Sequence, residues 1–262
     1  MISKIKSIFD HHWFFITLAV ISISISLAQC YFFIHHLEPN MDEGTYLVKG
    51  KYYLDGTYQL FEPFGPITNK MPFSFWILGL TQVWFRPGLL SARLFVLILF
   101  FLLNVFLWSS VNKIFGYKWA ALPVMVISLN PAVIMYYSRA NTQIISALFI
   151  ILSIWLILNN NLKIWNLILG ALCAVSTVLT RQNLLPYYVL YIFFLFWEFG
   201  WKKAVWPTLV SLLIFLSISA LFLPRIYTII WMPYIPSIIN KLILNLLRVQ
   251  PVNLGAPFLN KD

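Results

Sequence analysis

Residues 89–108 read LLSARLFVLILFFLLNVFLW, a stretch whose one charged side chain is Arg93. An α-helix rises about 1.5 Å per residue, so about 20 apolar residues cross the roughly 30 Å hydrocarbon core of a bilayer. A helix on the surface of a soluble domain would instead alternate polar and apolar faces. The stretch therefore predicts a membrane-spanning helix.

Apolar runs of similar length recur through the 262 residues, of which 61% are hydrophobic and 10% are charged. We expect an all-α polytopic membrane protein with about seven transmembrane helices. The expected spans lie near Trp13–Phe33, Leu89–Trp108, Trp119–Tyr137, Thr142–Leu158, Ile164–Thr180, Leu184–Trp197 and Ala204–Leu223. They form one transmembrane domain over residues 1–223. Residues 224–262 are expected to form a second outer loop or the start of a C-terminal part that the chain does not include.

Lysine and arginine are sorted between the two ends of these spans. Cytoplasmic loops are rich in basic residues, so the N-terminus is expected inside. This places one set of lysines at cytoplasmic ends: Lys4, Lys6, Lys113, Lys118, Lys163, Lys202 and Lys203. The same assignment places every arginine at or near the outer face: Arg86, Arg93, Arg139, Arg181, Arg225 and Arg248. Because guanidinium groups bind phosphate oxygens in a bidentate manner, this collar indicates an anionic ligand, with pairing to lipid headgroups as the equal alternative. The net charge of +10 then fits anionic lipid or a phosphate-bearing substrate, and we expect no nucleic acid partner.

The first outer loop, residues 34–88, gathers most of the scarce acids. Five of the eight lie there: Glu38, Asp42, Glu43, Asp55 and Glu62. The loop is too long for a simple connection and too apolar for disorder. We therefore expect an interfacial helix at Glu43–Leu54 and an interfacial or re-entrant helix at Met71–Phe85. A carboxylate just outside the membrane can be partly desolvated, which raises its pKa and suits it to proton abstraction. Asp42 and Glu43 are the candidates, and a solvated loop pair is the alternative.

The two cysteines, Cys30 and Cys173, both fall inside apolar segments. They provide neither a disulfide framework nor the ligand spacing of a metal site, and we interpret them as buried thiols. We expect no metal site and no cofactor.

Several short motifs occur in a recognisable order. They are Asp42-Glu43-Gly44-Thr45-Tyr46, Lys70-Met71-Pro72-Phe73, Ala92-Arg93-Leu94, Asn130-Pro131 through Tyr136-Tyr137-Ser138-Arg139, and Thr180-Arg181. Over residues 10–195 this order and spacing resemble the GT-C class of lipid-linked-sugar glycosyltransferases, in the protein-mannosyltransferase and aminoarabinose-transferase-like group. Such relatives usually carry an aspartate after the Tyr-x-Arg stretch, where this chain has Ala140-Asn141-Thr142-Gln143.

The resemblance implies transfer of a sugar from a polyprenyl-phosphate donor to a hydroxyl of a lipid, glycan or protein acceptor. By that resemblance Asp42 is the catalytic or acceptor-orienting carboxylate, and Lys70 contacts the donor phosphate. Glu43 is the second candidate base, and the other expected substrate-binding residues are Tyr46, Arg93, Arg139 and Arg181. The leaving phosphate is already a stable anion, so it needs cations more than it needs a general acid. One carboxylate is therefore enough, unlike the pair that glycosidases use.

The expected location is the bacterial inner (plasma) membrane, with the active site facing outside. Two other classes of function stay open. The first is a catalytically inactive or truncated GT-C-like membrane protein, which the missing aspartate favours. The second is a transporter, which would carry polar groups at mid-membrane on interrupted helices.

Overall fold

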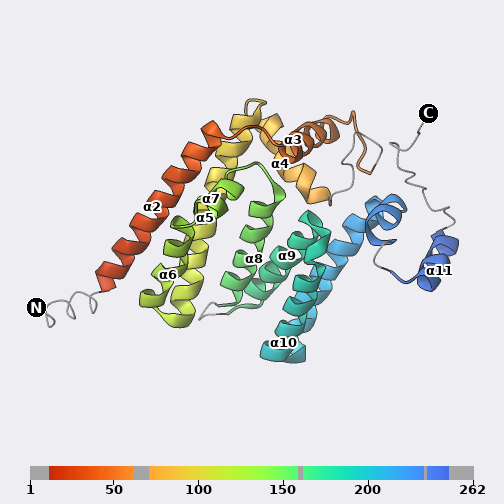
Figure 1. Ribbon diagram of the computed structural model, residues 1–262. Helices are drawn as coiled ribbons and strands as arrows, with labels where there is room; N and C mark the ends of the chain where they lie inside the picture. The colour runs from red at the N-terminus through yellow and green to blue at the C-terminus, as the bar shows by residue number, and fades with distance from the viewer. Residues whose placement is uncertain (1–11, 62–70, 159–161, 233–234, 248–262) are drawn as a thin grey trace, which may run out of the picture.

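A computed structural model describes residues 12–61, 71–158, 162–232 and 235–247, and every regular element within these ranges is helical (Figure 1). The all-α prediction is confirmed. The helices are α2 (His12–His36), α3 (Met41–Leu54), α4 (Pro72–Trp84), α5 (Leu89–Phe115), α6 (Tyr117–Ser128), α7 (Pro131–Tyr137), α8 (Thr142–Ile157), α9 (Ile164–Thr180), α10 (Leu185–Leu221) and α11 (Ser237–Leu247), with a 3₁₀ turn at Gln182–Leu184 and a π-helical turn at Tyr227–Trp231.

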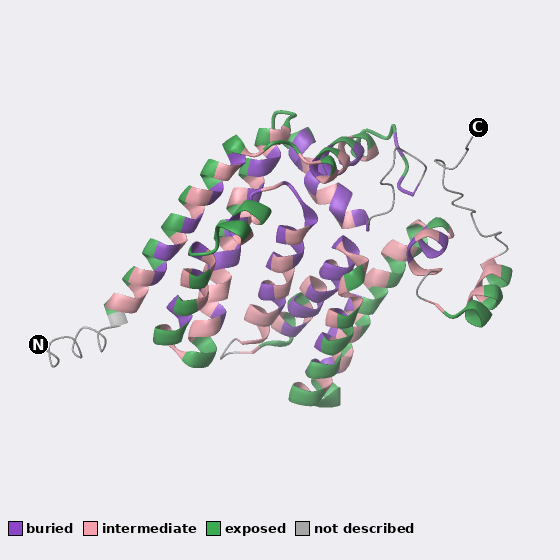
Figure 2. Ribbon diagram, viewed as in Figure 1, coloured by how far each residue is buried: buried purple, intermediate pink, exposed green. Residues whose placement is uncertain are grey.

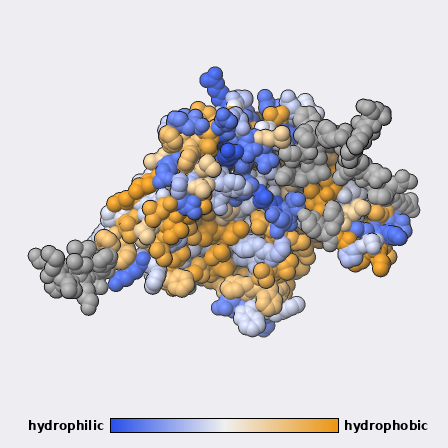
Figure 3. Space-filling view, viewed as in Figure 1, coloured by the Kyte–Doolittle hydropathy of each residue, from blue (hydrophilic) through white to orange (hydrophobic). Residues whose placement is uncertain are grey.

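Helices occupy all seven of the expected apolar segments, but they differ in length. Within the described ranges three helical stretches are long and apolar enough to cross a membrane, namely Trp13–His36, Leu89–Phe115 and Gln182–Leu221. Helices α6 and α7 make a fourth if the bent pair counts as one span, while α8 and α9 are shorter apolar helices. Apolar side chains cover much of the visible surface (Figure 3). A soluble protein rarely exposes apolar patches this large, which supports membrane insertion.

Helix α10 is two antiparallel arms that meet at Gly200. This glycine has φ 72° and ψ 168°, which no helical residue adopts. The Tyr188 hydroxyl on the first arm lies 2.8 Å from the Ser211 hydroxyl on the second. A straight helix would separate residues 23 positions apart by about 35 Å. The segments predicted at Leu184–Trp197 and Ala204–Leu223 are therefore the two arms of one helical hairpin, visible side by side in Figure 1.

The segment expected as one helix at Trp119–Tyr137 is broken, and that prediction is wrong in this respect. Helices α6 and α7 meet at an angle of 78°. Pro131 has no amide N–H to continue a helix and disfavours helical geometry at the residue before it. Asn130 accordingly has φ −113° and ψ 85°, and its side chain caps α7 by accepting a hydrogen bond of 3.2 Å from the Val133 amide. The sequence signal was present in Asn130-Pro131.

The two ends of the bundle differ in charge, as the sequence predicted. The α5–α6 turn, the end of α8, the start of α9 and the bend of α10 lie at one end of the molecule, which we call the lysine end (Figure 1). Its described lysines are Lys113, Lys118, Lys163, Lys202 and Lys203. The opposite end, the arginine end, holds the α2–α3 connection, the start of α5, the α7–α8 turn and the end of α9. The described arginines at or next to these elements are Arg86, Arg93, Arg139 and Arg181, and Arg225 follows the end of α10.

Helices α3 and α4 lie across the arginine end, where the expected interfacial helices were placed (Figure 1). They cross at two glycines. A Cβ atom on Gly79 would lie 2.5 Å from the carbonyl carbon of Gly50, which is too close for any side chain. Burial is concentrated where α4, α8 and α9 meet, whereas the outer faces of α2 and α10 are exposed (Figure 2).

Candidate functional site at the arginine end

Glu43 begins the site by capping its own helix. It is the third residue of α3, and its carboxylate accepts a 3.0 Å hydrogen bond from the Asn40 amide, while the Asn40 side chain accepts one of 3.0 Å from the Asp42 amide. This reciprocal arrangement is a capping box, which satisfies amides that have no partner inside the helix. The start of α3 is therefore fixed by its local sequence.

Arg93, near the start of α5, binds the same carboxylate in a bidentate manner. Its Nε lies 2.9 Å from Glu43 Oε1 and its Nη2 lies 2.8 Å from Oε2. Three further bonds of 2.8–3.2 Å go to the carbonyls of Ile34, Leu37 and Glu38, where α2 ends. A guanidinium has five N–H donors, and all five are used here. Arg93 consequently has no donor left for a phosphate.

The Glu43 carboxylate also joins α3 to the turn between α7 and α8. Its Oε1 accepts a 2.7 Å hydrogen bond from the Ala140 amide, and the residue is 0% exposed. Burial raises the pKa of Glu43, but the hydrogen bonds from Arg93, Ala140 and Asn40 together outweigh that effect. The pKa of Glu43 therefore lies below its ordinary value. Glu43 stays ionised with both oxygens occupied. The geometry assigns Glu43 and Arg93 to holding four segments together, in contrast to the expected roles in catalysis and substrate binding.

Asp42 differs from its neighbour. Its side chain is half-buried and has no hydrogen bond or ion pair with any residue that the structure describes. The Ala140 amide is hydrogen-bonded to Glu43, so these two stretches of chain are in contact. Asp42 is the residue before Glu43, and Arg139 is the residue before Ala140. One turn along α3, Tyr46 is 2% exposed and its ring lies 5.9 Å from that of Phe75, centroid to centroid. Tyr46 therefore packs α3 against α4, whereas the Asp42 carboxylate makes no contact of this kind with the described residues.

Arg181 brings the end of α9 to the same turn. Its Nη1 donates a 3.0 Å hydrogen bond to the Thr142 hydroxyl at the start of α8. The preceding residue, Thr180, accepts a 2.7 Å bond at its carbonyl from the Ser74 hydroxyl in the first turn of α4. Arg139 and Arg181 are both half-buried. Lys70, two residues before α4, lies outside the described residues, so its predicted contact with the donor phosphate stays a prediction.

Two amide side chains at the head of α8, beside this cluster, were not singled out by sequence reasoning. Two side-chain oxygens here are buried without a hydrogen-bond partner among the described residues. Asn141 is 2% exposed, and its Oδ1 is one of them. Gln143 Oε1 is buried and unpartnered as well, while its Nε2 donates a 2.6 Å bond to the Tyr136 hydroxyl. In the sequence this stretch stood out as lacking an acid. Whether an amide finds a partner is decided by the fold, so no sequence signal could have identified these two.

Lys49, on α3, is 3% exposed, with its ammonium 5.8 Å from the centre of the Tyr58 ring. Burial lowers its pKa to about 8.

Among the described residues, no group of three or more histidine, cysteine, aspartate or glutamate side chains is placed to hold a metal ion. Cys30 and Cys173 are free thiols, the first buried and the second half-buried.

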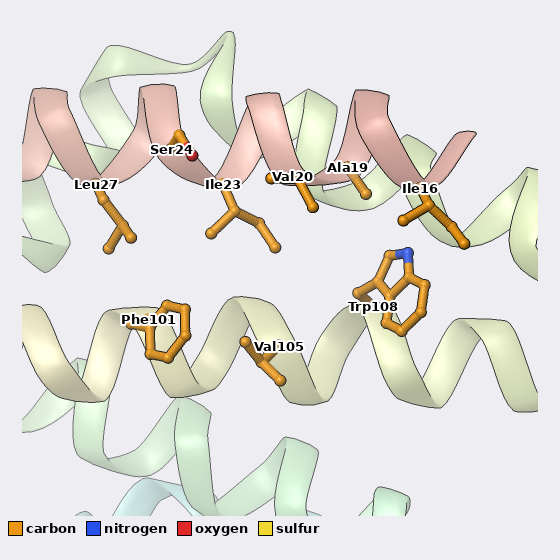
Figure 4. Close-up of a pocket in the computed structure, with 9 residues that line it drawn as sticks. All are labelled: Ile16, Ala19, Val20, Ile23, Ser24, Leu27, Phe101, Val105 and Trp108. Atoms are coloured by element: carbon orange, nitrogen blue, oxygen red, sulfur yellow. The ribbon is translucent and has the colours of Figure 1, made fainter. Parts of the chain in front are cut away.

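Cavities also lie apart from this cluster, and two of them are of interest. One of about 300 Å³ opens between α2 and α5, where Figure 4 shows apolar side chains of both helices facing each other across it, with Trp108 at one end. It contains none of the predicted site residues. The other, about 410 Å³, lies at the arginine end between the turn after α3 and the end of α10, and Arg225 contributes to its lining.

Comparison with known proteins gives one match. A family model described as dolichyl-phosphate-mannose-protein mannosyltransferase matches residues 69–225, more than half of the chain. The matched region includes Lys70, Arg93, Arg139 and Arg181, whereas Asp42 precedes it. No curated protein and no solved structure matches the chain.

Proposed function

Because the chain belongs to the dolichyl-phosphate-mannose-protein mannosyltransferase family, a group of GT-C-type membrane glycosyltransferases, we propose that it transfers a sugar at its arginine end. The donor is a polyprenyl-phosphate-linked sugar, and the acceptor is a hydroxyl of a lipid, glycan or protein. The acceptor oxygen forms a bond to sugar C1 as the bond from C1 to the phosphate oxygen breaks. The acceptor proton passes to a carboxylate, and the polyprenyl phosphate leaves as an anion.

Asp42 is the carboxylate in this proposal. It lies at the start of α3 with its oxygens free of partners among the described residues, whereas those of Glu43 are occupied. Arg139 and Arg181, together with Lys70, stabilise the leaving phosphate, since cations placed where charge develops lower the barrier of such a transfer. Guanidinium groups suit this task because they present two parallel donors to phosphate oxygens.

One observation carries the proposal: the 2.7 Å hydrogen bond from the Ala140 amide to the buried, charge-paired Glu43. It fixes the Asp42-bearing start of α3 against the turn that carries Arg139. The bond from Arg181 to Thr142, two residues further on, adds the end of α9. An acid and two cations from three distant parts of the chain thus gather at one end, which catalysis of this kind requires.

The test is transfer from a polyprenyl-phosphate-linked mannose by the protein in nanodiscs. Asp42→Asn keeps the shape of the side chain but removes its charge and basicity, and a general base typically contributes about 10²–10⁴-fold, so activity should fall by that factor. The matched control is Asp55→Asn, an exposed acid at the C-cap of the same helix, which should leave activity unchanged. An Asp42→Asn variant within about twofold of wild type would remove Asp42 from catalysis.

The proposed location is the inner membrane of a bacterium, with the arginine end outside. It is supported by the lysines at the opposite end, because cytoplasmic loops carry the excess of basic residues. Asp55→Cys, in a background without the native cysteines, should react with an impermeant thiol reagent in intact spheroplasts. Protection there, with labelling in inverted vesicles, would reverse the orientation.

A non-catalytic member of the family is the second candidate, favoured by the absence of an acid at residues 140–143. Such a protein would bind the lipid-linked sugar without transferring it. The two candidates differ in one measurement: wild-type protein that binds the donor in nanodiscs and shows no transfer to any acceptor class supports the second.

A further inference from the structure

We propose that the groove between α2 and α5 binds one acyl chain of a glycerophospholipid from the leaflet at the lysine end, with the ester carbonyl of that chain at Trp108. The groove is the cavity of about 300 Å³ shown in Figure 4. Every side chain that lines it is apolar or aromatic except that of Ser24, so its walls suit a hydrocarbon chain. The inference does not depend on the proposed sugar transfer.

The groove is as long as one leaflet is deep. On α2 it runs from Ile16 to Leu27, a distance of about 16 Å at 1.5 Å per residue. The hydrocarbon core of a bilayer is about 30 Å thick, so this is about half of it. On α5 the groove runs from Phe101 to Trp108, the last residue of the apolar stretch 89–108. Since α2 ends and α5 begins at the arginine end, the groove occupies the half of the membrane nearer the lysine end.

The width of the groove admits a single chain. A cavity of about 300 Å³ spread over about 16 Å has a cross-section of about 19 Å², whereas a helix with its side chains is about 10–12 Å across. One hydrocarbon chain fits this space, because carbon atoms pack at about 3.5–4.0 Å. The polyprenyl chain of the donor is a poorer occupant, since its phosphate is proposed to lie at the opposite end of the molecule.

Trp108 provides a polar group at one end of the groove. Its indole nitrogen is buried and has no hydrogen-bond partner among the described residues. In Figure 4 this nitrogen lies on the edge of the ring that faces α2. An indole N–H can only donate, and buried donors are nearly always paired, so the position favours an acceptor oxygen. An ester carbonyl lies where an acyl chain begins, at the membrane interface where tryptophan is enriched.

The charges beyond Trp108 match the phosphate of such a lipid. Lys113 lies five residues further along α5, about 7.5 Å closer to its end, and uses one of its three N–H donors on a carbonyl of α8. The ring of Tyr117 lies 6.0 Å from that of Phe15 on α2, and Lys118 is the next residue of α6. Helices α2, α5 and α6 contain no acidic residue that would repel a phosphate. Lysines near a membrane surface attract anionic lipids.

The experiment measures binding of dioleoyl phosphatidylglycerol to the delipidated protein by native mass spectrometry. Wild type should hold one such lipid. Val20→Phe narrows the groove from α2 and should weaken binding by about tenfold or more, the effect of losing contact with about two methylene groups. Val20 is 57% exposed, so this change leaves the core intact. Val105→Phe should act in the same way from α5. The matched control is Val189→Phe on α10, also 57% exposed, which should leave binding unchanged.

The ester contact has its own test. Trp108→Phe keeps an aromatic ring but removes the N–H, and it should weaken binding by about fivefold, the effect of one hydrogen bond between neutral groups. An ether-linked phosphatidylglycerol has no ester carbonyl, so wild type should prefer the ester lipid, whereas Trp108→Phe should bind both lipids equally. Trp206→Phe, an exposed tryptophan of α10, should keep the preference. A purely structural role for Trp108 would weaken both lipids alike.

Three results would overturn the inference. If Val20→Phe and Val105→Phe both bind the lipid as Val189→Phe does, the chain does not occupy this groove. If wild type is a dimer that Val20→Phe separates while lipid binding persists, a second copy of the protein occupies it instead. If Trp108→Phe still prefers the ester lipid, Trp108 does not contact the carbonyl.

Discussion

The buried pair of Glu43 and Arg93 gives the sharpest prediction about stability. Glu43→Gln keeps the size of the side chain and one acceptor oxygen. It replaces the other oxygen with an NH₂ group, which then faces donors: Arg93 Nε and the Ala140 amide on one side, or Arg93 Nη2 and the Asn40 amide on the other. The guanidinium of Arg93 stays charged, buried and without its counterion.

The size of the effect follows from that uncompensated charge. Removing one partner of a buried ion pair costs about 3–5 kcal/mol. For a chain of this length each kcal/mol lowers the melting temperature by about 2–4 °C, so Glu43→Gln should melt roughly 6–20 °C below wild type. Arg93→Met should lose at least as much, because the carbonyls of Ile34, Leu37 and Glu38 lose their donors too. The double variant should lose less than the sum of both, since it leaves no unpaired charge.

The assay is thermal unfolding in detergent micelles, followed by intrinsic tryptophan fluorescence. Glu38→Gln is the matched control: its carboxylate is exposed and only its backbone carbonyl contacts Arg93, so its melting temperature should equal that of wild type. A shift of less than about 2 °C for Glu43→Gln, under about 1 kcal/mol, would refute the role of this pair in holding the site. Losses that simply add in the double variant would refute the coupling.

Three further outcomes test other parts of the fold. Gly79→Ala should lower stability by about 1–3 kcal/mol, because its Cβ would overlap backbone atoms of Gly50. Gly44→Ala, whose Cβ would have no atom within 4 Å, should not lower it. Equal melting temperatures of the two variants would contradict the close crossing of α3 and α4. Cysteines placed at Tyr188 and Ser211 should be joined by a short bifunctional thiol reagent, and failure to join them would indicate that α10 is not a hairpin. Burial lowers the pKa of Lys49 from 10.5 to about 8, so between these values the unfolded chain binds more protons and stability should rise with pH; below about pH 8 the dependence vanishes. Lys49→Met should lack that rise, and an identical pH profile in chemical denaturation would show that Lys49 is not buried.

Much of the architecture was predictable because membrane helices are specified by local composition. Apolar length and period placed a helix at each of the seven expected segments, and the expected interfacial helices are α3 and α4. The local sequence also indicated the break in the helix before Pro131, although this break was not predicted. The bend at Gly200 is harder to foresee, since a glycine inside an apolar run does not by itself reveal whether the helix reverses.

The candidate site shows where sequence reasoning stops. The motif order led to Asp42, Glu43, Arg93, Arg139 and Arg181, but it could not separate their roles. Asp42 and Glu43 have similar sequence contexts. Adjacent residues on a helix nevertheless point in directions about 100° apart, so the two side chains have different surroundings. The fold buries one against Arg93 and leaves the other half-exposed.

The sequence by itself determined the all-α class, the positions of the helices, and the gathering of the described arginines at one end of the molecule. These properties depend on hydrophobic length and on charge near each helix end, which are local. Only the tertiary structure decided that Glu43 and Arg93 use all their hydrogen-bonding groups on each other and on backbone, and that α10 folds back at Gly200. It also decided that the side-chain oxygen of Asn141 has no hydrogen-bond partner among the described residues. Each of these depends on contacts between residues more than 20 positions apart or on the absence of such contacts, and a local pattern of residue types does not encode which distant groups will meet.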